Sequence, residues 1–271
     1  MDAIPPDLSA PGLLVAADEN EAAYWLRRAY LAGWEMCDEG DLTWYRSGRY
    51  RLLANGIVQA RLEPEIADAR IAAALAHFTA HNLPVAWFVG PAHRPANLGE
   101  RLEAHGLRCV GREPGMAVDL HALRDDIPQP DGLTIERVRN EDTLATWLRA
   151  YRNGEAVSAC APPVLMESCV PKRFGEDEPL RLFLARLDGM PVATAQLLLA
   201  AGVAGIYGVA TLPAARRQGI GAAVTRAALL HARTIGYRVG VLQATALGHG
   251  VYERLGFVDC CEFHLYGRLP S

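Results

Sequence analysis

Three runs of apolar residues in the second half of the chain predict three consecutive buried strands. The runs cover residues 180–187, 191–200 and 203–211. Asp188-Gly189 and Ala201-Gly202 stand between them, and both dipeptides are typical of tight turns. The pattern therefore predicts an antiparallel meander in this part of the chain.

Further elements are expected on both sides of this meander. A strand is predicted at residues 133–138, and Gly236 is the expected C-cap of a long helix. The other expected elements are a helix at 141–152, a helical or irregular stretch through 162–174, the long helix at 220–235, a strand at 238–245, a short helix within 248–256, and one or two strands at 257–266.

The first half repeats part of this order. Its expected elements are a turn at Asn55-Gly56, a strand at 57–62, a helix at 67–81, a strand at 84–90, a short helix at 97–105 and a strand at 115–120. We interpret the two halves as copies of one fold that meet near residue 128, within the proline- and aspartate-rich linker 125–132. The alternative to a duplication is that both halves have this order of strands and helices by chance, since it is common in mixed α/β domains.

Composition limits the class of protein. Of the 271 residues, 51% are hydrophobic and 21% are charged, which is enough apolar material for a packed core. The net charge of −4 argues against a nucleic-acid partner. No CxxC pair or zinc spacing occurs among the six cysteines, so we expect reduced thiols and no metal site.

The uncharged stretch 189–215 is long enough to raise the alternative of a transmembrane helix. Pro191 and Pro213 stand near its ends and three glycines interrupt it, so we favour two buried strands and expect no membrane partner. The amino terminus shows no basic and apolar leader, and we therefore expect a cytoplasmic protein.

The segment 216–221, RRQGIG, has the features of an anion site at a helix start. The first turn of a helix leaves backbone N–H groups without partners, and the helix dipole places partial positive charge at the same end. Gly219 and Gly221 allow a pyrophosphate close to the backbone, while Arg216 and Arg217 add positive charge. A glycine-rich turn with two solvated arginines is the alternative.

In its context this segment resembles the cofactor signature of the GNAT superfamily of N-acetyltransferases, [Q/R]-x-x-G-x-[G/A]. Arg216, Gly219 and Gly221 fill the signature, and residues 250–257, GVYERLGF, resemble the family's YxxxGF element. The resemblance covers roughly residues 133–268. It implies acetyl-CoA as co-substrate, bound by Val209, Ala210, Thr211, Arg216, Arg217, Gln218, Gly219, Ile220, Gly221 and Thr245.

The resemblance also implies a reaction. Tyr252 would be the general acid that protonates the departing CoA thiolate. Val209, Ala210 and Thr211 would pair with the pantetheine amides like an added strand edge. Thr245 stands near the position where many members carry an asparagine that hydrogen-bonds the cofactor.

One departure from the family pattern concerns the general base. Many members place a glutamate four residues before the first pantetheine-pairing residue, and this chain has Gly205 there. Tyr207, on the same face of the strand, is an alternative that could orient a water or the substrate. The other candidates for the base are Glu155, Glu167, His249 and His264.

The first half lacks the anion loop. Three carboxylates, Glu63, Glu65 and Asp68, stand at its helix start and would repel a pyrophosphate. This half therefore resembles the degenerate partner domain of tandem GNAT proteins. Its aromatic residues Trp34, Trp44, Tyr45 and Trp87 are expected either to line a cleft or to pack in the core.

The resemblance thus implies an α/β (α+β) fold of two GNAT-like domains, residues 1–128 and 129–271, each with a mixed, mostly antiparallel sheet flanked by helices. The expected function is direct transfer of an acetyl group from acetyl-CoA to an amine of a small-molecule acceptor. A non-catalytic acyl-CoA-binding regulatory module and another acyl-CoA reaction on the same fold are the alternatives. A homodimer is a further possibility.

Overall fold

The computed structural model describes residues 7–8, 10–124, 126–154 and 168–269. The chain divides into two compact units, and each unit is built from separate stretches of sequence. Unit 1 comprises Met1–Asn20, Pro114–Ser158 and Val170–Cys260, and unit 2 comprises Glu21–Glu113, Ala159–Cys169 and Cys261–Ser271. The predicted boundary near residue 128 does not coincide with this division, because the chain crosses between the units several times.

Unit 1 contains a six-stranded part of the sheet in the order β5-β10-β9-β8-β7-β6. All neighbours are antiparallel except β9 and β10, which are parallel. The strands are β6 (Leu133–Arg137), β7 (Leu180–Leu187), β8 (Met190–Ala200), β9 (Val203–Thr211), β10 (Val239–Gln243) and the part of β5 (Arg108–Asp119) that lies after Glu113.

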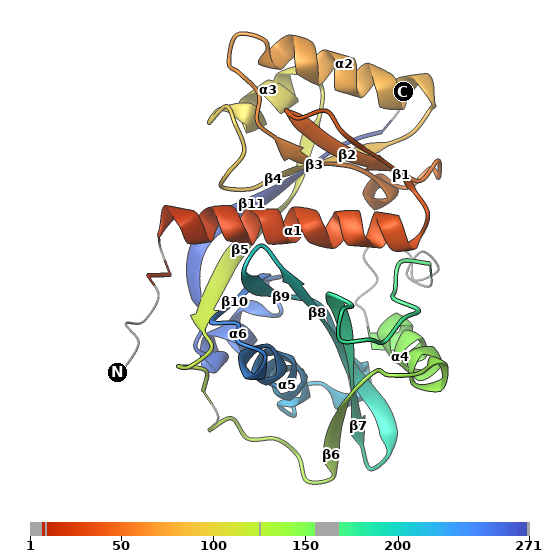
Figure 1. The fold of residues 1–271 in the computed structure, drawn as a ribbon, viewed down its shortest axis with the longest axis vertical. Coiled ribbons are helices and arrows are strands. Elements are labelled where there is room, and N and C mark those ends of the chain that lie inside the picture. The colour runs from red at the N-terminus through yellow and green to blue at the C-terminus, as the bar shows by residue number, and fades with distance from the viewer. Residues whose placement is uncertain (1–6, 9, 125, 155–167, 270–271) are drawn as a thin grey trace. The chain divides into compact units, whose positions relative to one another are not determined.

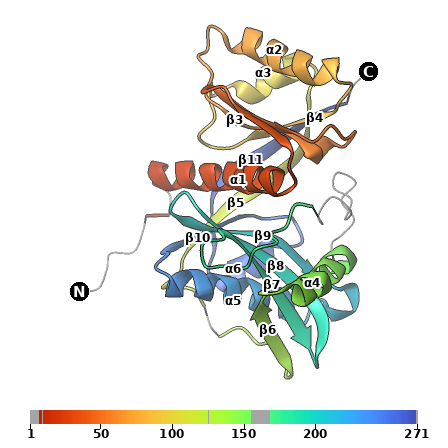
Figure 2. The ribbon, with the colours of Figure 1, turned by 45° about the vertical axis from the view of Figure 1, so that its right-hand side comes forward.

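Among the described residues, three α-helices belong to unit 1 in addition to the start of α1 (Pro11–Leu31). They are α4 (Glu141–Gly154), α5 (Ile220–Thr234) and α6 (His249–Leu255). Figures 1 and 2 show α4 and α5 on opposite faces of strands β7 and β8. Alanines on α5 allow it to lie close to the sheet, where a Cβ added to Gly240 of β10 would stand 2.8 Å from the side chain of Leu229.

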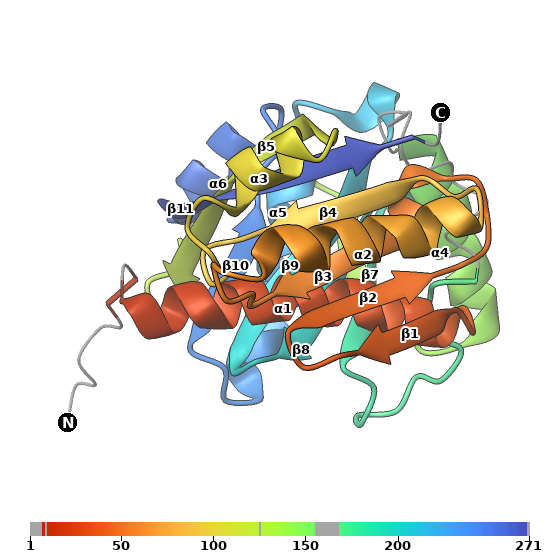
Figure 3. The ribbon, with the colours of Figure 1, turned by 90° about the horizontal axis from the view of Figure 1, so that it is seen from above.

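In unit 2 the strand order is β1-β2-β3-β4-β11-β5. Its strands are β1 (Glu35–Asp38), β2 (Leu42–Arg46), β3 (Asn55–Ala60), β4 (Val85–Val89), most of β11 (Val258–Arg268) and the first part of β5. A 3-10 turn, η1 (Leu52–Ala54), precedes β3, and Figure 3 shows α2 (Ala67–Ala80) lying over β2, β3 and β4. The short helix α3 (Leu98–Ala104) comes after β4.

The chain takes the same path twice. In one half it runs β3-α2-β4-α3-β5, and in the other β9-α5-β10-α6-β11. In each half the first helix links two parallel neighbours, and the last strand then pairs with the other half's strand: β5 with β10 and β11 with β4. The predicted repeat of element order is therefore present, and it is combined with an exchange of the final strands.

The predicted turn at Asn55-Gly56 is wrong. Both residues lie inside β3, and Asn55 is fully buried. Its side-chain amide donates to the carbonyl oxygens of Arg49 and Arg51 at 2.9 and 3.0 Å, and its carbonyl accepts the N–H of Ser47 at 3.1 Å. The asparagine thus stabilises the preceding loop from within the strand.

The structure bears on two expectations, one for the uncharged stretch 189–215 and one for the cysteines. The uncharged stretch 189–215 forms strands β8 and β9, as predicted, and among the described residues no helix is long and apolar enough to cross a membrane. Five cysteines of the described part of the chain are free thiols, and Cys160 lies outside it. The residues described contain no cluster of metal-ligating side chains.

Candidate functional site

The RRQGIG segment forms a tight loop between β9 and α5. The loop comes after a 3-10 turn, η3 (Pro213–Ala215), and its backbone is left-handed at Arg217 (φ 62°) and at Gly219 (φ 79°), which is the N-cap of α5. No side chain caps this helix start. Within the described residues, no acceptor is recorded for the N–H groups of Gln218, Gly219, Ile220 and Gly221. These groups form the kind of donor cradle that binds anions.

The guanidinium of Arg216 is hydrogen-bonded to two backbone carbonyls. It donates to the carbonyl oxygens of Thr211 at 3.0 Å and of Gly154 at 3.1 Å. Gly154 ends α4 and packs on the backbone of β9, where a Cβ would lie 3.2 Å from Thr211. Arg216 therefore ties the end of α4 to the end of β9, while the side chain of Arg217 is exposed beside the loop.

The linker before β6 also contacts this loop. A Cβ on Gly219 would overlap the carbonyl oxygen of Pro128, so only glycine fits here without a shift of the backbone. Ile127 packs against the core of unit 1, and the N–H of Arg124 donates to the carbonyl oxygen of Leu255 at 3.2 Å. Within the predicted linker, Ile127 thus packs on the core and Pro128 contacts the candidate anion site, while most of its other described residues are exposed.

Strands β9 and β10 separate just before the loop. Their parallel pairing is limited to Ala204 with Gly240 and Gly205 with Val241. Further along, β9 pairs with β8 through a bulge at Gly208, whose φ is 53°. Within the described part of the chain, residues 209–211 therefore have a strand partner on one edge and none on the other.

Space at Gly205 is filled by a residue from far along the sequence. A Cβ on Gly205 would overlap Oδ1 of Asn20 and would lie 2.7 Å from the ring of Tyr207. Asn20 belongs to α1 and is fully buried. No longer side chain fits at position 205 in this arrangement, so the place of the family's glutamate is occupied by an asparagine amide.

The hydrogen bonds of Asn20 fix its orientation. Its amide nitrogen donates to the carbonyl oxygens of Ala200 at 2.9 Å and Val203 at 3.3 Å. Oδ1 consequently faces the hydroxyl of Tyr207, which donates to it at 2.8 Å. Sequence reasoning did not identify Asn20, because nothing in a helix sequence 185 residues upstream of Gly205 signals this contact.

Tyr252 lies on α6 with 9% of its surface exposed. Its ring makes an edge-on contact with Phe257, with 5.9 Å between the centroids, and Val209 packs against the same apolar cluster. Thr245 is exposed in the segment between β10 and α6, and its hydroxyl accepts the N–H of Gly248 at 3.3 Å. Thr245 therefore helps to begin α6, and its hydroxyl proton can still be donated.

Of the remaining candidates for the general base, the two histidines are described by the structure, and each lies beside a carboxylate. Nε2 of His249 lies 2.9 Å from Asp259, and this hydrogen bond raises the pKa of the imidazole, which disfavours the neutral form that a base requires. His264 contacts Glu262 at 2.6 Å on β11. Glu155 and Glu167 lie outside the described residues.

In unit 2 the corresponding strand edge is closed. Beyond the parallel pairing of β3 with β4, Arg94 continues the ladder: its N–H donates to Ala60 at 2.9 Å, and its carbonyl accepts from Leu62 at 3.2 Å. The first turn of α2 carries Asp68, which pairs with Arg101 and lies 3.1 Å from His105. Trp44, Tyr45 and Trp87 are buried in the packed core of this unit.

We compared this chain, with its anion cradle and open strand edge, with known protein families and solved structures. Residues 123–257 match the acetyltransferase (GNAT) family. The matched segment begins between β5 and β6 and ends just after α6, and it contains the anion loop, the open edge of β9 and Tyr252.

Solved structures with similar folds include GNAT proteins over nearly the whole chain. A GCN5-related N-acetyltransferase from Kribbella flavida has a TM-score of 0.73 at 22% identity, covering 97% of this chain and 98% of its own. One from Sphaerobacter thermophilus has 0.65 at 18%, covering 98% and 93%. A tandem GNAT protein from the clavulanic acid biosynthesis pathway has 0.59 at 13%, covering 94% and 97%. Comparison with curated protein sequences gave no match.

Proposed function

We propose that this protein is an N-acetyltransferase that moves an acetyl group from acetyl-CoA to an amine of a small-molecule acceptor. The observation that carries the proposal is the junction of β9 and α5. There, a strand edge that the described residues leave unpaired is followed, after the turn η3, by an uncapped helix start with left-handed Gly219. The family match and the GNAT fold support acyl transfer.

The residues present fit a CoA ester. The N–H groups of residues 218–221 suit the pyrophosphate, and exposed Arg217 adds a guanidinium beside them. The open edge at Val209, Ala210 and Thr211 suits the amides of pantetheine, which would pair with it as a further strand does. In the proposed arrangement Arg216 holds the cradle in shape rather than contacting phosphate.

The chemistry proposed is direct attack. The free amine nitrogen forms a bond to the thioester carbonyl carbon, the carbon–sulfur bond breaks, and Tyr252 protonates the departing thiolate. The proton that the nitrogen loses passes to water, and Tyr252 regains its proton from water, so the products are the acetylated amine and free CoA. Backbone N–H groups on the open edge of β9 would stabilise the oxyanion. Because Asn20 occupies the place of the usual base, Tyr207 is the group that we propose to orient the incoming amine.

The arrangement at Gly205 also favours a second candidate. A chain whose usual carboxylate position is closed by Asn20 could bind acyl-CoA as a regulatory module without transferring the acyl group. The same absence of a carboxylate at position 205 would suit another acyl-CoA reaction on this fold. We further propose that the N-terminal half is a degenerate copy of the GNAT fold, supported by the repeated path β-α-β-α-β and the closed edge at Arg94.

One experiment separates these candidates. Purified protein is incubated with acetyl-CoA and a panel of amines, and the release of CoA and the identity of the product are measured together. An acetylated amine formed in step with free CoA supports transfer. Tight binding of acetyl-CoA without turnover indicates the regulatory module, and CoA release with no acetylated amine indicates another acyl-CoA reaction.

A further inference from the structure

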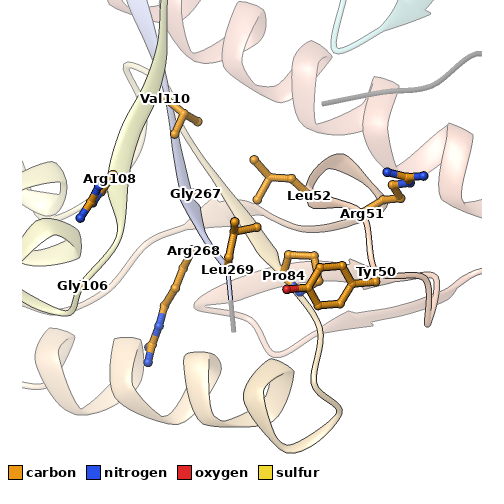
Figure 4. A pocket seen from close by; sticks show the side chains of 10 residues that line it. All are labelled: Tyr50, Arg51, Leu52, Pro84, Gly106, Arg108, Val110, Gly267, Arg268 and Leu269. Atoms are coloured by element: carbon orange, nitrogen blue, oxygen red, sulfur yellow. The ribbon is translucent and has the colours of Figure 1, made fainter. Parts of the chain in front are cut away.

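Unit 2 contains a pocket that is separate from the β9–α5 junction, which belongs to unit 1. It has a volume of about 620 Å³, and it opens at one end of the neighbouring strands β4, β11 and β5. That volume falls within the range of roughly 300–1,000 Å³ that small-molecule sites occupy. Residues from η1, the start of β4, the start of β5 and the end of β11 line it (Figure 4).

The centre of this pocket is apolar. Leu52, Pro84 and Leu269 lie at its centre in Figure 4, with the ring of Tyr50 and the side chain of Val110 nearby. Tyr50, Val110 and Leu269 are 54%, 52% and 64% exposed, although large apolar side chains are mostly buried in this chain. These three residues therefore offer an apolar surface to a ligand.

Three arginines line the outer parts of this pocket. In Figure 4 the guanidinium group of Arg51 lies on one side of the pocket and those of Arg108 and Arg268 on the other, all pointing outward from Leu52 and Leu269. Among the residues described, no acidic residue lines the pocket. Within the described part of the chain no hydrogen bond or ion pair is recorded for any of these guanidinium groups.

Three other arginines of unit 2 have acidic partners. Arg46 pairs with Glu35, Arg70 with Asp41 at 2.7 Å, and Arg101 with Asp68. By contrast, the pocket brings together three arginines for which the described residues record no such partner, in a chain with a net charge of −4. An anionic ligand would supply the partner that the described residues do not.

The wall that carries Tyr50 and Arg51 is preorganised. The buried amide of Asn55 holds the carbonyl oxygens of Arg49 and Arg51, and the N–H of Arg51 donates to Arg49 at 2.8 Å. On the opposite wall Gly267 allows Leu52 to approach, since a Cβ there would lie 3.1 Å from Leu52 Cδ2. Binding would thus require little ordering of the backbone.

We propose that this pocket binds a small organic anion with an aromatic or branched apolar body and a carboxylate or phosphate group. The apolar body would contact Leu52, Val110 and Leu269. The anionic group would bind Arg108 and Arg268, because the planar guanidinium matches both carboxylate and phosphate geometry. This site is additional to the proposed acetyl-CoA site and does not depend on it.

The test uses the full chain and three probes that share one ring system: 2-naphthoate, 2-naphthyl phosphate and neutral 2-naphthamide. Isothermal titration should give one site per chain for at least one of the two anions, with a Kd of about 1 mM or tighter. The amide should bind at least tenfold more weakly than that anion. The order of the two anions tells which headgroup the site prefers.

Variants test the contacts. The double variant Arg108→Gln/Arg268→Gln should weaken binding of the preferred anion at least tenfold and leave the amide unchanged. Arg49→Gln is the matched control, because Arg49 is exposed in the same loop and does not line the pocket. Val110→Trp should weaken all three probes by filling the apolar centre. Equal affinity for the amide and the anions, no binding of either anion, or unchanged affinity in the double variant would overturn the proposal.

Discussion

The two parallel strand pairs of this protein share a path and differ in the segment that comes after the first strand of each pair. After β9 the chain makes a glycine-rich loop with two arginines, and the strand edge at residues 209–211 has no partner among the described residues. After β3 the chain has three carboxylates, and Arg94 extends the ladder across the same edge. The same path of strands and helices therefore leaves room for an extended cofactor only at β9, where the hydrogen bonds to the parallel strand stop early and the start of the following helix is uncapped.

The pairs β9/β10 and β3/β4 also differ in the size of the side chains where their strands pair. Gly205 of β9 pairs with Val241 in the way that Ile57 of β3 pairs with Trp87. In unit 2 two large apolar side chains fill these positions. In unit 1 the glycine is required by Asn20, so the tertiary structure has replaced a possible catalytic side chain by a buried amide.

The largest expected effect, on the affinity for acetyl-CoA, comes from a glutamate substituted at the start of α5. Gly219→Glu introduces a side chain at a left-handed residue, against the carbonyl oxygen of Pro128, and places a negative charge beside the pyrophosphate. We expect acetyl-CoA to bind at least about 100-fold more weakly, since like charges in contact cost several kcal/mol. Isothermal titration measures this. Glu65→Gly in unit 2 is the control and should keep one site per chain; a second site would show that charge alone separates the two junctions.

Restoring the family's glutamate should damage the fold instead of supplying a base. Gly205→Glu places its Cβ onto Oδ1 of Asn20. We expect the free energy of unfolding to fall by about 3 kcal/mol, from overpacking and from burial of a carboxylate. Urea unfolding monitored by tryptophan fluorescence measures the loss. A variant as stable as the parent, with faster turnover, would show that the site accepts a side chain here after all.

Tyr252→Phe keeps the ring in the core and removes the proton donor. If Tyr252 protonates the CoA thiolate, single-turnover acetyl transfer should slow by about 100-fold, with little change in acetyl-CoA affinity. Tyr266→Phe is a matched control, because Tyr266 is a buried tyrosine of unit 2 and has no proposed role in transfer. Equal rates for Tyr252→Phe and the parent at every pH would exclude the acid role.

Asn20→Ala should have a moderate effect on stability. It leaves the carbonyls of Ala200 and Val203 without their amide donor and removes the acceptor of the Tyr207 hydroxyl. The expected loss is about 2 kcal/mol in the free energy of unfolding, as for a broken buried hydrogen-bond group. If Tyr207 orients the amine, KM for the acceptor should also rise in Asn20→Ala while the Kd of acetyl-CoA stays unchanged. A stability loss with an unchanged KM would make Asn20 purely structural.

The smallest expected effect concerns His249. Asp259 raises its pKa, so the pair stabilises the folded state below the unfolded pKa of histidine, and this contribution disappears as the pH rises through the folded pKa. His249→Gln should therefore lower the melting temperature slightly near pH 5.5 and not near pH 9. Acetyl transfer should be unaffected at both pH values. A large loss of activity confined to high pH would restore His249 as the base.

Local sequence determined much of the element order and the candidate anion loop. The bounds of β7 and β9 agree with their apolar runs, and α5 begins at Ile220 as predicted, because these elements depend on nearby residues and on glycine. The hydrophobic pattern did not predict helix α1, because this helix buries Asp18, Asn20 and Arg28 among its apolar residues and the polar positions obscure the periodicity.

Only the tertiary structure decided which strand edges pair and what fills Gly205. The exchange of β5 and β11 joins strands from opposite halves of the chain, and hydrogen bonds between strands carry no signature in either sequence alone. The amide of Asn20 reaches Gly205 across 185 positions for the same reason. Local physics fixes a loop that can bind an anion, whereas long-range pairing decides whether the strand beside it stays open and whether a catalytic side chain has room.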